Sequence, residues 1–217
     1  MRLTNRRGKT RTRQTIVYRK YYGLEKRSIT FYESPASTRG TALLSFNYGD
    51  EREDDQWLYL PAARKIRRIS SSDRGDYFLG TDFTFEDIDS EGRVELADYA
   101  RRTVGEEDVD GHHCYIVESV PVSQKIAKEL GYGRVRSWVD SDIWVTRKAK
   151  YWDVQGVPLK TLHVTDIRQI DGIWSTHHML MENLKTGHAS VFEFNDIDYA
   201  SEIGSELFTQ RTLRQGR

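Results

Sequence analysis

The chain has 217 residues, of which 37% are hydrophobic and 30% are charged, and 33 Lys plus Arg balance 33 Asp plus Glu. This composition supports a hydrophobic core, and it excludes a membrane-embedded chain because no run reaches the ~18 apolar residues of a spanning helix. The balanced charge excludes a protein-wide attraction to nucleic acid or anionic lipid, so any such attraction must come from a local patch.

Residues 1–20 are basic and contain no acid, and Lys9, Arg11 and Arg13 share one face of a strand pattern. Two interpretations fit: a charged edge strand that resists aggregation, which we favour, or a surface that faces phosphate. The segment has no hydrophobic stretch of the signal-peptide type. Cys114 stands alone, which excludes an intrachain disulfide and a cysteine zinc knuckle.

Alternation with period 2 dominates the rest of the chain and predicts about ten to eleven strands in an antiparallel meander. Turn signals occur at 153–158, at 185–187 and at Asp171-Gly172, the strongest hairpin signal. The strands are expected within 11–23, 28–33, 41–49, 56–60, 113–120, 136–146, 149–154, 159–170, 173–184 and 189–199.

Three segments interrupt the alternation. Residues 70–90 mix small polar residues with aromatic ones and predict an irregular loop. Residues 122–132 predict a short helix, with Ser123 as its N-cap and Gly131 as its stop, and 204–215 predict a second one. Nothing marks a linker, so we expect one domain over residues 1–217.

Several side chains are candidates for chemistry. His112-His113-Cys114 and His177-His178 invite a metal site, but adjacent strand residues point to opposite faces, so we expect no metal. Asp140 and Asp142 lie two apart on one predicted strand and form a candidate carboxylate pair. Because no other catalytic motif accompanies them, we expect no enzyme and no cofactor, and a hydrolase that uses these acids or a histidine is the weakest alternative.

Three stretches carry a family resemblance: residues 40–89, with the runs WLYLPAARKIRRI and DFTFED, the W-V-D strand at 138–140, and the hairpin ladder at 157–198. From about Leu3 to Tyr199 the chain resembles the outer membrane lipoprotein-sorting protein family of the LolA/LolB-like superfamily. The resemblance implies a mainly β fold, in which a large antiparallel sheet curls into a half-open barrel with short helices and a loop as a lid over an apolar cavity.

This resemblance also implies a function: a periplasmic carrier that binds a lipid or the acyl chains of a lipoprotein for transfer toward the outer membrane. Members commonly begin with a signal peptide and a first helix, which we expect to be absent from this chain. They often occur beside resistance-nodulation-division exporters, so the alternative is a non-transporting module that docks such an exporter. We expect a monomer that binds no nucleic acid and makes at most peripheral membrane contact.

The side chains expected to contact the lipid are the apolar members of one face of each strand, together with aromatic residues of the lid. If these side chains fill the interior themselves, no cavity is left. The periodicity of the sequence does not distinguish a filled interior from one with a lipid-binding cavity. The strand residues are Leu44, Phe46, Trp57, Tyr59, Ile143, Leu162, Val164, Met179, Met181, Phe192 and Phe194, and the lid residues are Tyr77, Phe78, Phe83 and Phe85.

Overall fold

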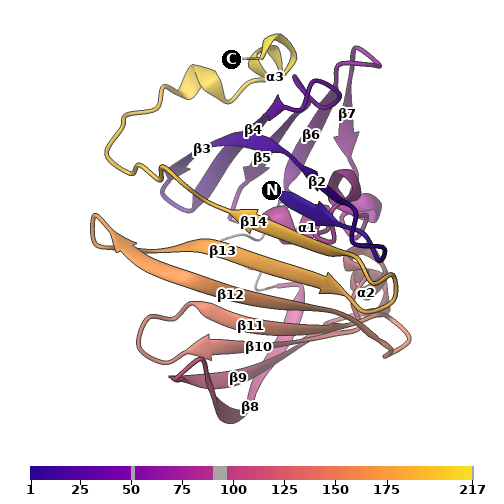
Figure 1. Ribbon diagram of the computed structural model, residues 1–217, viewed down its shortest axis with the longest axis vertical. Helices are drawn as coiled ribbons and strands as arrows, with labels where there is room; N and C mark the ends of the chain where they lie inside the picture. The colour runs from indigo at the N-terminus through magenta and orange to yellow at the C-terminus, as the bar shows by residue number, and fades with distance from the viewer. Residues whose placement is uncertain (50–51, 90–96, 217) are drawn as a thin grey trace. The chain divides into compact units, whose positions relative to one another are not determined.

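The computed structural model describes residues 1–49, 52–89 and 97–216 (Figure 1). Its contacts form two compact units, one comprising Met1, Thr12–Asp73 and Ser201–Arg217, the other Arg2–Arg11 and Arg74–Ala200. Both are built on antiparallel sheets, which confirms the predicted mainly β fold, and among the described residues neither sheet closes on itself. No helix in the described ranges is long and apolar enough to cross a membrane.

The first unit contains a five-stranded sheet whose strands are neighbours in chain order. Its core is formed by Ile29, Phe31 and Leu44 of the sheet together with Phe208 and Leu213 of the C-terminal segment. The elements are β3 (Gln14–Tyr22), β4 (Glu25–Ser34), β5 (Ala42–Asn47), β6 (Asp55–Leu60), β7 (Lys65–Ile69), the 3₁₀ turns η1 (Ser71–Asp73) and η3 (Ser205–Leu207), and helix α3 (Gln210–Gln215).

The second unit contains a nine-stranded sheet in the order β2-β1-β14-β13-β12-β11-β10-β9-β8. Short helical segments accompany it: η2 (Phe78–Gly80), α1 (Phe85–Asp89) and α2 (Gln124–Leu130). The strands are β1 (Arg2–Thr4), β2 (Thr10–Thr12), β8 (Tyr99–Val109), β9 (His112–Pro121), β10 (Arg134–Asp140), β11 (Thr146–Trp152), β12 (Pro158–Ile170), β13 (Ile173–Asn183) and β14 (Ala189–Glu193).

The predicted turns and caps of the second unit are confirmed. Ile170 pairs with Ile173 across a two-residue turn in which Asp171 and Gly172 have φ of 49° and 82°, the left-handed backbone that a tight hairpin needs. Ser123 Oγ accepts from Ile126 N at 3.2 Å and caps α2, while Gly131 ends it with φ of 78°. The basic N-terminal segment supplies β2, an edge strand, as predicted.

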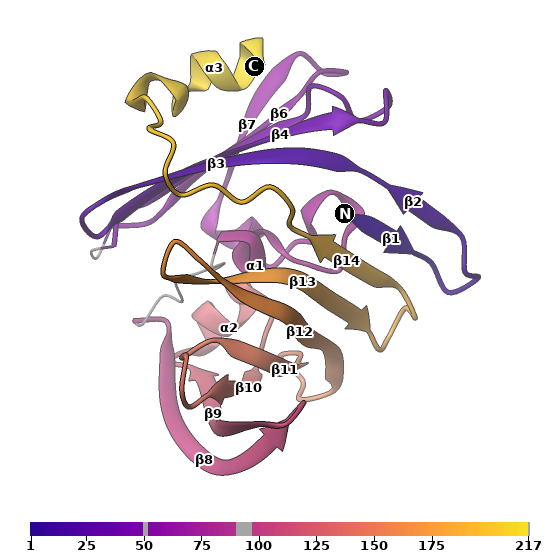
Figure 2. The same cartoon turned by 60° about the vertical axis from the view of Figure 1, so that its left-hand side comes forward.

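Two features differ from the prediction. The expected strand 136–146 is wrong, because Asp140 Oδ1 accepts from the backbone N–H groups of Asp142 at 2.9 Å and Ile143 at 3.2 Å, and this turn separates β10 from β11. Strands β7 and β8 were not predicted, since most of their residues are exposed and show no apolar alternation. Figure 2 shows β8 curving at the sheet edge, where its register shifts between Thr103 and Gly105.

Candidate functional site

The register of β12, β13 and β14 places a set of predicted lipid contacts on one face of the nine-stranded sheet. Leu162 lies opposite Met181, and Val164 lies opposite Met179, which in turn faces Phe192. Directly opposed residues of neighbouring strands point to the same side. This apolar face carries the predicted set Leu162, Val164, Met179, Met181, Phe192 and Phe194, of which Met179 and Phe194 are half-buried and the rest are buried.

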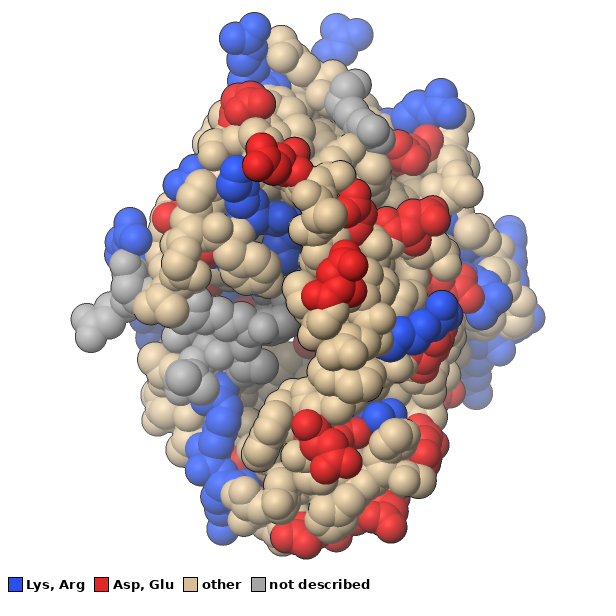
Figure 3. Space-filling model, turned by 90° about the vertical axis from the view of Figure 1, so that its left-hand side faces the viewer, with Lys and Arg blue, Asp and Glu red and all other residues tan. Residues whose placement is uncertain are grey.

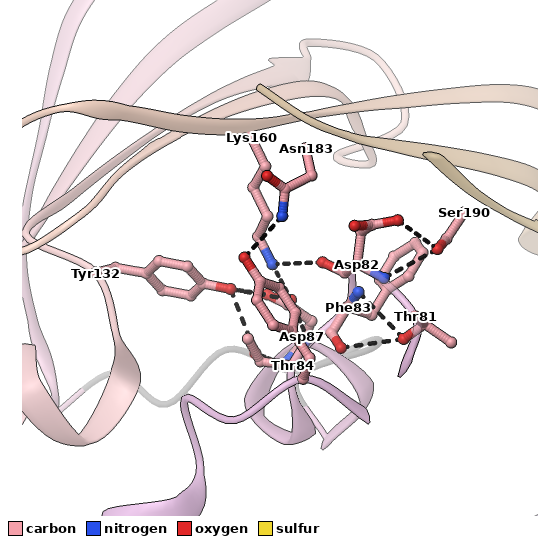
Figure 4. Close-up of polar contacts among 10 residues, drawn as sticks. Thr81, Asp82, Phe83, Thr84, Asp87, Tyr132, Lys160, Asn183 and Ser190 are labelled. Atoms are coloured by element: carbon pink, nitrogen blue, oxygen red, sulfur yellow. Dashed lines mark hydrogen bonds and ion pairs between the residues drawn. The ribbon is translucent and has the colours of Figure 1, made fainter. Parts of the chain in front are cut away.

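A covering segment, residues 76–88, packs on this face (Figure 4). The ring of Phe83 stacks on Phe192 with centroids 4.2 Å apart, and Phe78 and Phe85 meet edge to face at 5.4 Å. All three predicted lid phenylalanines are therefore part of the core, whereas Tyr77 keeps 41% of its surface exposed. Ser90, the last residue of the predicted irregular loop, lies outside the described residues.

Lys160 of β12 lies at the centre of the contact between the covering segment and the sheet. Its side chain is fully buried, and Nζ donates to the Asp82 carbonyl at 3.0 Å and to Asp87 Oδ2 at 2.5 Å. The hydroxyl of Tyr132 donates to Asp87 Oδ1 at 2.9 Å. We call Lys160, Asp82, Asp87 and Tyr132 the Lys160 cluster.

Burial governs the electrostatics of this cluster. It lowers the pKa of Lys160, because an ammonium loses its hydration there, although the charge of Asp87 opposes the shift. Burial also raises the pKa of Tyr132, and the neighbouring Asp87 raises it further. The Lys160 ammonium lies 5.0 Å from the ring centroids of both Tyr132 and Tyr151, so aromatic faces replace part of the lost water.

Two more side chains of the sheet hold the covering segment. Ser190 Oγ accepts from Asp82 N at 2.9 Å and donates to Asp82 Oδ2 at 2.7 Å. Asn183 Nδ2 donates to the Tyr77 hydroxyl at 2.8 Å. Lys160, Asn183 and Ser190 thus fasten the segment from β12, β13 and β14, and exposing the apolar face beneath it requires breaking these hydrogen bonds (Figure 4).

Helix α2 meets the chain just before the covering segment. Gly75 N donates to Glu129 O at 2.8 Å, and a Cβ on Gly75 would lie 2.9 Å from the backbone of Leu130, so only glycine fits. Arg74 beside it binds Glu86 at 2.8 Å and Asp98 at 2.9 Å. These contacts fix the path by which the chain enters the covering segment.

The other predicted lipid contacts lie elsewhere. Leu44, Phe46, Trp57 and Tyr59 share one face of the five-stranded sheet in the first unit, where they pack with Phe208 and Leu213 of the C-terminal segment. Ile143 is half-buried in the turn between β10 and β11. The structure therefore gathers the predicted set into separate groups, and the group beneath the covering segment is the candidate site.

A groove of about 420 Å³ lies between the end of β8 and the strands β11 and β12, and it contains one predicted contact, Leu162. His163 Nε2 and Asp110 Oδ2 are 2.7 Å apart at this groove. The remaining lining residues are Asp108, Val109, Lys148 and Thr161.

Among the candidate residues for chemistry, His112 Nδ1 lies 3.5 Å from Asp140 Oδ2, and Cys114 is the cross-strand partner of Asp140 in β9 and β10. Within the described ranges, no group of three or more His, Cys, Asp or Glu side chains is arranged to hold a metal ion. The ring of His177 contacts the Ser175 carbonyl at 3.1 Å, and that of His178 contacts Thr165 Oγ1 at 3.0 Å. Asp140 is buried against Arg147 Nε at 2.6 Å, and β10 ends at Asp140, so the prediction that Asp140 and Asp142 lie on one strand is wrong.

Buried carboxylates predict how the fold responds to acid. Burial raises the pKa of Asp140, but hydrogen bonds from Arg147 and two backbone amides outweigh it and leave the pKa below its ordinary 3.8. Hydrogen bonds from Arg102 and Arg136 lower the pKa of Glu118 from 4.5. A carboxyl with a lower pKa in the folded state contributes stability above its unfolded pKa and loses it as pH falls through the folded pKa.

We therefore expect the free energy of unfolding to fall steeply as the pH drops below about 4.5, as measured by urea denaturation at a series of pH values. Arg147→Met should reduce this slope, because it removes a hydrogen bond that lowers the pKa of Asp140. A stability curve that stays level from neutral pH to about pH 2 would contradict the prediction.

Comparisons with known proteins identify the family to which the chain belongs. A family model described as "-like: Uncharacterized protein" matches residues 24–215. A search of curated proteins finds no significant match. Among solved structures, a domain assigned to the outer membrane lipoprotein-sorting proteins from Vibrio parahaemolyticus is 27% identical with a TM-score of 0.89, over 98% of this chain and 88% of that one.

Two further solved structures are similar to the chain over nearly its whole length. A DUF1329 family protein from Desulfovibrio piger is 32% identical with a TM-score of 0.87, over 98% of this chain and 88% of that one. A LolA superfamily protein from Nitrosomonas europaea is 26% identical with a TM-score of 0.70, over 96% of this chain and 86% of that one. The chain thus belongs to a LolA-like family that includes outer membrane lipoprotein-sorting domains, as the sequence resemblance predicted.

Proposed function

We propose that this protein is a periplasmic, non-enzymatic carrier that binds a lipid or the acyl chains of a lipoprotein on the apolar face beneath the covering segment. The observation that carries the proposal is the apolar face itself, which a short segment covers in a LolA-like fold. Half-buried Met179 and Phe194 are the proposed first contacts, with Leu162, Val164, Met181 and Phe192 behind them. The flexible thioether of Met179 suits chains of varied shape.

Transfer energetics support a carrier. Each methylene that enters water costs about 0.8 kcal/mol, so a lipid with two acyl chains does not cross an aqueous compartment unaided at a useful rate. A protein that shields part of each chain lowers this barrier. In the proposal the covering segment is the gate, and cargo binding has to compensate for the hydrogen bonds that Lys160, Asn183 and Ser190 make with it.

Met179→Asp tests the proposed site. A carboxylate on this face should lower the affinity for a fluorescent fatty acid by at least about tenfold, because acyl contact would desolvate the charge. Leu180→Asp is the matched control, since Leu180 is the next residue of β13, is also half-buried and points to the opposite face. We expect the control to bind the probe as the unmodified protein does.

Native mass spectrometry of gently purified protein supplies an independent measurement. Co-purified fatty acid or phospholipid is the expected result. A clean apo mass, together with no binding of the fluorescent probe, would overturn the carrier. Equal loss of probe binding in both aspartate variants would place the lipid elsewhere than on the apolar face.

The alternative function, docking of an inner-membrane exporter without transport, is favoured by one observation. The basic strand β2, with Arg11 exposed, is an edge strand of the nine-stranded sheet. An edge strand offers unpaired backbone groups to a partner. The same mass measurement separates the two functions, because a docking module needs no bound lipid.

A further inference from the structure

Exposed aliphatic side chains gather at one end of the nine-stranded sheet. Because the strands alternate in direction, the turns β1–β2, β11–β12 and β13–β14 lie at the same end, together with the connection from β9 into α2. We call this the α2 end; it lies on the right in Figure 1. Its exposed aliphatic residues are Val122 (56%), Val154 (42%), Val157 (48%) and Leu184 (55%).

Cations lie at the same end of the sheet, on its turns and on helix α2. The β1–β2 turn contributes Arg6, Arg7 and Lys9, and Arg6 lies against Gly187 of the β13–β14 turn, where a Cβ would meet its Cγ at 3.2 Å. Helix α2 contributes Lys125, whose side chain is 81% exposed, and the β13–β14 turn contributes Lys185. Exposed Lys128 completes the set.

Acidic side chains at the α2 end do not cancel this charge. Asp153 is buried and binds Lys185, and Glu129 has 16% of its side chain exposed and pairs with Lys125 at 3.7 Å. Glu182 near the end of β13 is exposed. The cations at this end therefore outnumber the acids, although the whole chain has a formal net charge of zero.

The opposite end of the same sheet has the opposite charge. Its turns and the strand ends beside them carry Glu106, Asp108, Asp110, Asp142 and Asp171, all exposed. In Figure 3, which views the molecule from the side toward which these turns point, acidic side chains gather in the lower part. Trp144 (71%) and Trp174 (46%) are exposed there too, so both ends of the sheet carry exposed apolar side chains. The two ends therefore differ in the sign of their charge.

We propose that the α2 end docks on an anionic phospholipid surface. Aliphatic side chains at protruding turns would enter the interface between head groups and acyl chains, while the surrounding lysines and arginines contact the anionic head groups. Each cation near such a surface contributes about fivefold to affinity, a contribution that salt screens. The acidic end would be repelled, so docking has one orientation.

Vesicle co-sedimentation tests this directly, with the full chain free of added cargo. Vesicles of phosphatidylglycerol with phosphatidylcholine should bind the protein at low salt, and vesicles of phosphatidylcholine alone should not. The triple variant Arg6→Gln, Arg7→Gln, Lys9→Gln should weaken binding about 100-fold. Val154→Ser with Leu184→Ser should also weaken it, because both side chains are exposed and their loss leaves the core intact.

The acidic end supplies the matched control. Trp144→Ser with Trp174→Ser removes apolar surface from that end and should leave vesicle binding unchanged. Equal loss of binding in both serine pairs, equal binding to neutral and anionic vesicles, or no binding to anionic vesicles at low salt would each overturn the proposal. The docking proposal and the proposed acyl binding are tested independently. The vesicle assay needs no cargo, and the fatty acid assay needs no membrane.

Discussion

Replacing Lys160 with methionine is expected to lower the free energy of unfolding by about 3–5 kcal/mol, the usual cost of removing one partner from a buried ion pair. Methionine fills a similar volume, so the loss is electrostatic. Asp87, with 9% of its side chain exposed, would lose the ammonium 2.5 Å away, and the Asp82 carbonyl would lose its lysine donor. Urea denaturation followed by circular dichroism measures the change.

The chain contains a matched lysine for this experiment. Lys148 of the neighbouring strand β11 has 29% of its side chain exposed and lies 3.6 Å from Glu107. Lys148→Met should cost less than about 1 kcal/mol, as expected for an ion pair open to water. If Lys160→Met costs no more than this control, the Lys160 cluster does not hold the covering segment as we describe.

A double variant isolates the pairing itself. Lys160→Met with Asp87→Leu removes both charges, and replacing both members of a buried pair by apolar residues is often close to neutral. We expect it to be more stable than Lys160→Met alone, although Tyr132 and the backbone N–H of Thr84 lose their acceptor on Asp87. Amide hydrogen exchange within the covering segment should follow the same order, fastest in the single variant.

The apolar face of the nine-stranded sheet could be predicted because one side of β12–β14 is buried. Where one face is buried and the other contacts water, side chains alternate, and the positions of Leu162, Val164 and Met181 follow from counting by two. Strand β8 gave no such signal, since residues such as Arg102 and Glu106 are exposed on both sides of the chain. An edge strand of this kind is recognised only by its pairing with β9.

The Lys160 cluster could not be assembled from the sequence, because its members are far apart along the chain. Lys160 and Asp87 are separated by 73 positions, and Tyr132 and Asp87 by 45. One signal was present: Lys160 has the same parity as Leu162 and Val164, so a charged residue occupied a position predicted to be apolar. A lysine inside an apolar pattern requires a buried partner, but periodicity does not identify the partner.

Phe208→Ala in the first unit is expected to cost about 3–5 kcal/mol of unfolding free energy, as large-to-small core substitutions of phenylalanine do. Phe208 is 2% exposed and packs in the cluster that contains Leu44 and Leu213. The C-terminal segment is also tied down by Lys20 Nζ, which donates to Ile203 O at 2.5 Å, and by the Tyr22 hydroxyl, 2.7 Å from Ser205 Oγ. These tethers keep the segment in place, so the substitution leaves a void.

That void would lie next to the predicted contacts Leu44, Phe46, Trp57 and Tyr59, which the C-terminal segment covers. An apolar void of this kind stays dry and binds small apolar molecules, so a benzene-sized ligand should restore part of the stability of Phe208→Ala and leave Phe208→Leu nearly unchanged. A loss below about 1 kcal/mol would mean that the C-terminal segment contributes little to this core. The face of the five-stranded sheet would then be a second candidate surface for an acyl chain, in place of the C-terminal segment.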